Sequence, residues 1–292
     1  MIVITTPTGR IGRRLLGTVL DAGAPVRVIV RDAARLPAEV RDRAEVVEGS
    51  HGDLDVVTKA FAGADTVFWL APPDHRAASL DDVYSGFARP ACEAFVREGV
   101  QRVVGVSALG RGVLPNAGHV TATLAMDDLI ADTGVHYRAL TLPTFMDNML
   151  TQVESIKNQG VFFSPISGDR KMPTCAVRDI ADAAAKLLLD PSWTGRGDVP
   201  LLGPEDLSQN DMARIMSEVL GRPVRYQWVS IDAFKASMLE RGVSEAYTQG
   251  LADMAVAKNN GLDNAEPRTP QSTTPTTFRT WCEDVLKPAV LG

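Results

Sequence analysis

The first twelve residues constrain the fold of this chain more than any other stretch. Residues 2–5 are a β-branched run typical of a buried strand, Thr8 and Gly9 suit a tight turn, and apolar residues recur at helical spacing from Ile11 onward. A strand, a turn and a helix in this order leave backbone N–H groups unpaired at the positive end of the helix dipole. The sequence therefore predicts a turn that can hold a pyrophosphate.

The glycine spacing supports this interpretation. Thr6-x-x-Gly9-x-x-Gly12 follows the dinucleotide fingerprint, with a threonine in place of its first glycine. Gly9 permits close approach of phosphates, and Gly12 lets the helix pack against its strand. The alternative is an ordinary strand-to-helix turn without a ligand. The residues of the turn that we expect to contact a cofactor are Thr6, Thr8, Gly9, Arg10, Ile11 and Gly12.

The end of the second strand indicates which dinucleotide would bind. Residues 26–30 form an apolar strand that Arg31 follows directly. A carboxylate at this place usually holds the ribose 2′-OH of NAD, whereas an arginine accommodates the 2′-phosphate of NADP. Arg31, with Arg35 one turn later, therefore favours NADPH, and NADH is the alternative. Arg31 could instead be a solvated charge paired with Asp32.

Strands and helices alternate up to residue 148, which predicts an α/β fold with a doubly wound parallel sheet. We expect a helix over residues 80–98 with a kink or break near Arg89, because Pro90 disrupts a helix interior. The fourth strand ends at Leu70, Ala71 and Pro72, which we expect to border the cofactor. The six strands expected in this sheet are residues 2–5, 26–30, 45–48, 65–70, 101–106 and 137–142.

Residues 149–292 predict a smaller C-terminal α/β lobe that binds substrate, with some segments returning to the dinucleotide-binding domain of residues 1–148. Residues 264–277 are rich in proline and threonine and suggest a surface loop before a final helix at 278–286. Core packing accounts for most of the methionines and aromatic residues of this region, although the methionines also suit a roomy, adaptable pocket. The candidate substrate-binding residues are Phe145, Met146, Met149, Trp228 and Tyr247.

Composition limits the classes of partner that the chain can bind. The net charge is −6 and the basic residues are dispersed, which argues against nucleic acid and anionic membranes as partners. Three distant cysteines and four scattered histidines form no disulfide framework and no metal site. No targeting segment and no apolar span of membrane length is evident, so we expect a cytoplasmic protein. Its partner is expected to be a small molecule, and the oligomeric state stays open.

Six motifs occur in an order that suggests a known family. They are residues 8–12, 28–32, 62–68, 142–148, 177–181 and 276–278. This order resembles the NmrA-like group of atypical short-chain dehydrogenases/reductases along nearly the whole chain. The resemblance implies an NAD(P)-binding Rossmann domain with a smaller lobe over the nicotinamide. It leaves the chemistry open, because the group includes ketone and quinone reductases as well as redox sensors.

One departure from the wider family concerns the proton donor. Its reductases carry Tyr-x-x-x-Lys on the helix after strand five, where the tyrosine protonates the product. The matching positions here are His119 and Thr123, so neither side chain is present. His119 is a candidate acid, with a structural role at the helix start as the alternative. Ser107 is a candidate partner for a substrate carbonyl, or a residue that holds its own turn.

These observations favour an NADPH-dependent reductase of a ketone or quinone, with a bulky aromatic, polyketide-type natural product of secondary metabolism as the expected substrate. A ketone beside a phenol carries its own hydrogen-bond donor, so protonation assisted by the substrate would need no protein acid. A nucleotide-sensing regulator that binds NADP(H) without turnover is the alternative from a different functional class.

Overall fold

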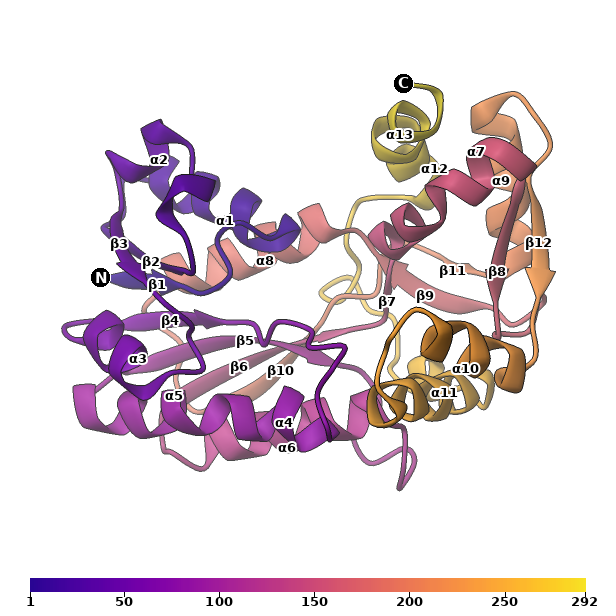
Figure 1. Cartoon of the computed structure of the whole chain (residues 1–292). Coiled ribbons are helices and arrows are strands. Elements are labelled where there is room, and N and C mark those ends of the chain that lie inside the picture. The colour runs from indigo at the N-terminus through magenta and orange to yellow at the C-terminus, as the bar shows by residue number, and fades with distance from the viewer.

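A seven-stranded parallel sheet forms the centre of the larger domain (Figure 1) in the computed structural model, which describes residues 1–292. Its strand order is β10-β6-β5-β4-β1-β2-β3, so the direction of winding reverses between β1 and β4. The strands are β1 (Ile2–Ile4), β2 (Val26–Val30), β3 (Glu45–Glu48), β4 (Thr66–Trp69), β5 (Arg102–Ala108), β6 (His136–Leu142) and β10 (Arg196–Pro200).

Helices cover both faces of this sheet, as expected for a doubly wound fold (Figure 1). Ile2 and Ile4 of β1 pack on one face in a cluster with α1 (Arg10–Asp21) and α8 (Val177–Leu189). Val3, between them, faces the other side, because side chains alternate along a strand. The helices that cover this second face are α3 (Leu54–Phe61), α5 (Ser85–Glu98) and α6 (His119–Ala131).

The expectation of six strands was wrong, because β10 adds a seventh at the edge beside β6. This strand and α8 lie beyond residue 148 in sequence but pack with the larger domain. Strand β10 has little hydrophobic pattern, since Arg196 and Asp198 are exposed and none of its residues is fully buried. The sequence therefore did not assign it to the sheet.

The kink expected near Arg89 was also wrong. The helix breaks earlier, at Tyr84, which separates α4 (Leu80–Val83) from α5 and has φ −115° and ψ −84°. Pro90 then lies in the second turn of the new helix. In a helix the ring of a proline crowds the carbonyl group four residues earlier. For Pro90 this carbonyl belongs to Gly86, and the backbone of glycine adapts more easily than that of other residues.

The smaller lobe contains two short sheets and a cluster of helices. Ser208 caps the N-terminus of helix α9 through a reciprocal capping box with Asp211. The strands of the lobe are β7 (Thr144–Phe145), β8 (Val161–Ser164), β9 (Met172–Cys175), β11 (Asp206–Leu207) and β12 (Arg225–Trp228). Its helices are η2 (Met146–Gln152), α7 (Val153–Gln159), α9 (Gln209–Leu220), α10 (Ile231–Glu240) and α11 (Glu245–Asn259).

The segment after α11 is more buried than the surface loop that was expected. Ser272, Thr274 and Thr276 are all buried. The carboxylate of Asp179 on α8 accepts hydrogen bonds from the N–H and hydroxyl of Thr276, at 3.1 and 2.7 Å. The segment therefore ties the end of the chain to the larger domain. It includes η3 (Leu262–Asn264) and leads to α12 (Phe278–Trp281), a π-helical turn η4 (Cys282–Leu286) and α13 (Lys287–Leu291).

All three cysteines are buried and free. None of the helices combines the length with the apolar character that a crossing of the bilayer would require.

Candidate functional site

The turn between β1 and α1 is closed by tight backbone packing. The N–H of Gly9 donates to the carbonyl oxygen of Thr6 at 3.0 Å. A Cβ added at Gly12 would lie 2.1 Å from that same oxygen, so only glycine fits there. Thr6 itself has φ +51°, the one non-glycine residue in the left-handed region. A strained β-branched residue held in place by its surroundings is typical of a functional site.

Several polar groups of this turn lack protein partners. Helix α1 has no side-chain cap at Gly9 and no acidic residue in its first turn. The hydroxyl of Thr6 is buried without a hydrogen-bond partner. Free N–H groups and an unused hydroxyl at the positive end of a helix suit an anion. These groups therefore fit the pyrophosphate of a dinucleotide.

A groove of about 610 Å³ passes this turn at the carboxyl ends of β1, β2 and β4, where the strand order reverses. Ligands of open α/β sheets bind at such a position. We call it the dinucleotide groove. The structure brings eight of the expected cofactor residues together in its lining, namely Thr6, Thr8, Gly9, Arg31, Arg35, Leu70, Ala71 and Pro72.

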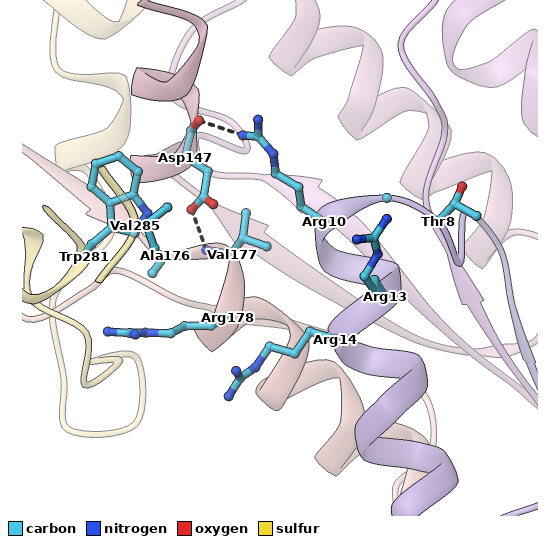
Figure 2. A pocket seen from close by; sticks show the side chains of 11 residues that line it. Thr8, Arg10, Arg13, Arg14, Asp147, Ala176, Val177, Arg178, Trp281 and Val285 are labelled. Carbon is cyan, nitrogen blue, oxygen red and sulfur yellow. Dashed lines mark hydrogen bonds between the residues drawn. The ribbon is translucent and has the colours of Figure 1, made fainter. Parts of the chain in front are cut away.

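The other three expected cofactor residues lie outside the lining of the groove. Ile11 and Gly12 are buried behind the turn, where they fix its shape. The side chain of Arg10 leaves the groove and donates to the carbonyl of Asp147 at 2.9 Å (Figure 2).

Arg31 lines the groove without a carboxylate partner. The side chain of Asp32, the partner considered from the sequence, accepts the N–H of Ala34 at 2.9 Å instead. Arg31 is therefore free to meet a ligand phosphate at the end of β2.

His51 is a lining residue that the sequence did not identify. Its ring packs edge-on against Trp69 and Phe87, with centroids 5.2 and 4.9 Å apart. Its Nε2 lies 3.0 Å from the carbonyl of Leu70, so this nitrogen carries the proton and donates. Burial lowers the pKa of His51 to about 4. The imidazole is thus a neutral wall of the groove.

A second cavity of about 480 Å³ lies between α1, α8 and the end of the chain (Figure 2). We call it the arginine pocket, after Arg10, Arg13, Arg14 and Arg178 in its lining. Arg13 and Arg14 follow Arg10 by three and four residues, so both lie beside Arg10 on the surface of α1. This spacing could have been noted in the sequence.

Ser107 is buried and already engaged. Its hydroxyl donates to the carboxylate of Asp127, and the hydroxyl of Tyr137 donates to the other carboxylate oxygen at 2.6 Å. Arg111 lies 3.6 Å from this buried carboxylate. Burial raises the pKa of Asp127 to about 6. Ser107 therefore belongs to an internal network rather than to the lining of the groove.

His119 is also buried, and both ring nitrogens have partners. Nε2 lies 3.0 Å from the carbonyl of Tyr247, and Nδ1 lies 3.0 Å from the hydroxyl of Tyr84. The carbonyl requires a proton on Nε2, so Nδ1 accepts from Tyr84. Burial lowers the pKa of His119, which keeps the ring neutral. This arrangement weighs against His119 as an acid.

The candidate substrate residues do not form one lining. Met146 and Tyr247 are buried, Phe145 and Met149 are half-buried against the core clusters, and the side chain of Trp228 is 54% exposed. None of the five lines the dinucleotide groove or the arginine pocket.

A model of the NmrA-like family matches residues 1–282. The chain belongs to this family. A furanone phosphate reductase of Streptomyces griseus is 29% identical to this NmrA-like protein over 85% of each chain. An NAD(P)H azoreductase of Xenophilus azovorans is 28% identical over 87% of this chain and 86% of its own.

Solved structures share the fold of this NmrA-like protein. A nucleoside-diphosphate-sugar epimerase from Staphylococcus aureus superposes with a TM-score of 0.82 at 20% identity, over 97% of this chain and 99% of its own. An NADPH-dependent quinone oxidoreductase of Escherichia coli, complexed with NADPH, superposes with a TM-score of 0.75 at 22% identity. The match covers 93% of this chain and 97% of the oxidoreductase. At these identities the likeness supports the Rossmann-like fold alone.

The buried Asp127 predicts a pH dependence of stability. Its pKa rises from 3.8 to about 6 on folding, so the native state binds more protons than the unfolded state between these values. The free energy of unfolding should fall by roughly 3 kcal/mol from this group as pH rises through the window. Urea unfolding between pH 4 and 7, compared between wild type and Asp127→Asn, measures this contribution.

Comparison of the wild type with Asp127→Asn cancels the contribution of every group that titrates in both proteins. His51, whose pKa is lowered, gives a slope of opposite sign, but it does so in both proteins. Asp132→Asn, at the exposed end of the same helix, should keep the wild-type slope. Equal slopes for wild type and Asp127→Asn would contradict the prediction.

Proposed function

We propose that this NmrA-like oxidoreductase uses NADPH to reduce a ketone or quinone. The observation that carries the proposal is the dinucleotide groove at the reversal point of the sheet, with an uncapped glycine turn at its centre and Arg31 and Arg35 at one end. Two arginines at the end of β2, where NAD-specific sites hold a carboxylate, support a ligand with a 2′-phosphate.

The relatives support reduction as the reaction type. Their names describe reductases of a furanone phosphate, of azo compounds and of quinones. Within this range we propose a bulky aromatic substrate of the polyketide type, from secondary metabolism. Of the candidate side chains, Trp228 is exposed enough to offer an apolar contact for it, whereas Phe145 and Met149 pack partly against the core.

The protein offers no free acid among the residues considered for this role. Ser107 donates to Asp127, and both nitrogens of His119 are occupied. NADPH would supply the hydride to the carbonyl carbon, and the oxygen then needs one proton. We propose that a phenol adjacent to the carbonyl donates this proton and later regains one from water. The protein then contributes mainly the relative position of the reactants.

The oxidation of NADPH with a panel of aromatic ketones and quinones tests the proposed function. Ketones that carry a neighbouring phenol should react faster than the same ketones with the phenol methylated, because methylation removes the internal donor. Tight NADPH binding with no oxidation by any compound would contradict the reductase. It would favour the regulator that senses NADP(H) without turnover.

Arg31→Asp should shift cofactor preference from NADPH toward NADH. The change removes a charge-assisted contact with the 2′-phosphate and offers the 2′-OH an acceptor. Such a contact contributes about 1.5–3 kcal/mol, so binding of NADPH should weaken by roughly ten- to a hundredfold. Fluorescence titration with each nucleotide measures the change.

The control for this substitution is Arg241→Asp, which makes the same change in net charge at an exposed site outside both cavities. It should leave both affinities unchanged. An unaltered preference in Arg31→Asp would assign the phosphate contact to Arg35.

His119→Ala should lower turnover by less than about tenfold, because the ring only supports neighbouring groups. A general acid would contribute about 10²–10⁴. Tyr84→Phe, which removes the hydroxyl that bonds His119, should behave similarly. Turnover at saturating substrate, with folding checked by circular dichroism, decides the point. A larger loss in His119→Ala with intact folding would assign the proton to this histidine.

A further inference from the structure

The arginine pocket is distinct from the dinucleotide groove in its lining. The two cavities share only Thr8 and Gly9, so the glycine turn forms the wall between them. Figure 2 shows that the pocket is bounded on one side by the first turns of α1 and on the other by Trp281 and Val285 near the end of the chain.

The charges of the pocket are not all neutralised. Arg10 donates to a backbone carbonyl, and Arg13 has no hydrogen bond or ion pair from its side chain. The carboxylate of Asp147 is directed at the N–H of Val177, at 3.1 Å, rather than at a guanidinium. The two guanidinium groups of Arg10 and Arg13 therefore meet no carboxylate of this chain.

The other two arginines are held in fixed positions. Asp182 binds Arg14 through two hydrogen bonds of 2.9 Å. The side chain of Arg178 bonds the hydroxyl of Thr276 and the carboxylate of Asp284, each at 2.8 Å. Because their orientation is already fixed, little side-chain entropy would be lost when a ligand binds.

Trp281 closes the pocket on the side of the chain's end. The residue lines the pocket and is only 1% exposed, yet its indole N–H has no hydrogen bond in the structure. Because this nitrogen is itself enclosed, the indole bounds the pocket without offering a donor to a ligand. In Figure 2 the indole lies across the pocket from Arg13.

Guanidinium groups from α1 and α8 around one cavity suit an oxyanion with several acceptor oxygens. Arginine matches phosphate oxygens through paired N–H donors, and a dianion gains more from two unneutralised charges than a monoanion does. We propose that the arginine pocket binds the phosphate group of a small molecule while a dinucleotide occupies the neighbouring groove. This inference rests on the proposed function for its assignment of the groove to NADPH.

Calorimetric titration of phenyl phosphate into NADPH-saturated protein tests the inference at constant ionic strength. Phenyl phosphate should bind at one site, and benzoate should bind more weakly. Arg13→Gln should reduce the affinity for phenyl phosphate by about ten- to a hundredfold, the usual contribution of a charge-assisted hydrogen bond. Its folding should be unaffected, because the side chain of Arg13 makes no bonds to the protein. Arg241→Gln, which removes an exposed charge elsewhere, should bind phenyl phosphate as the wild type does.

Three outcomes would overturn the inference. Phenyl phosphate could fail to bind the NADPH-saturated protein, its binding could be unaffected by Arg13→Gln, or it could displace NADPH, which would make the pocket part of the dinucleotide site. A separate NADPH titration distinguishes these outcomes from failure of the proposed function. Protein that binds no NADPH contradicts that function, whereas protein that binds NADPH but excludes phenyl phosphate contradicts only the second site.

Discussion

The contact on which both cavities depend is the packing of Gly12 against the carbonyl oxygen of Thr6. A side chain at position 12 would come within 2.1 Å of that oxygen, so the closeness of helix α1 to strand β1 requires glycine. This closeness brings the first turn of α1 to the carboxyl edge of the sheet. One side of the turn then faces the dinucleotide groove, and the arginines on the other side face the arginine pocket. The left-handed conformation of Thr6 shows that the chain accepts strain to keep this geometry.

The lobe is joined to the larger domain by buried carboxylates at the start of α8. Asp147, at the start of the lobe, accepts the N–H of Val177, and Asp179 accepts two hydrogen bonds from Thr276. Negative groups are favourable at a helix N-terminus, so these carboxylates also stabilise α8. The same residues position Arg178 and the segment that carries Trp281. The arginine pocket therefore forms only when both ends of the lobe are in place.

The sequence predicted the parts of the fold that local rules govern. The glycine turn and the strands at 26–30 and 45–48 agree with the structure because hydrophobic runs and turn residues are local signals. The features that depend on distant contacts were missed. Strand β10 is held by its pairing with β6, and Thr276 is held by Asp179. Tyr84, at the break between α4 and α5, is hydrogen-bonded to the distant His119. For the site, the groove residues could be predicted because they follow strand ends. The engagement of Ser107 and His119 could not, because Asp127 and Tyr247 are brought to them only by folding.

His119 occupies the position at which reductases of the wider family carry their tyrosine acid, and its contacts are of a different kind. A tyrosine acid at the start of α6 would need its hydroxyl free to reach a substrate. His119 instead joins Tyr84, before α5, to the backbone of Tyr247 in α11, so it connects the larger domain to the lobe. A side chain that holds two elements together through both nitrogens cannot release a proton without breaking one of these bonds. Its lowered pKa adds to this, because a neutral imidazole has no extra proton to give near neutral pH. The residue at this position thus connects the lobe to the larger domain, which is why the proposed reduction takes its proton from the substrate rather than from His119.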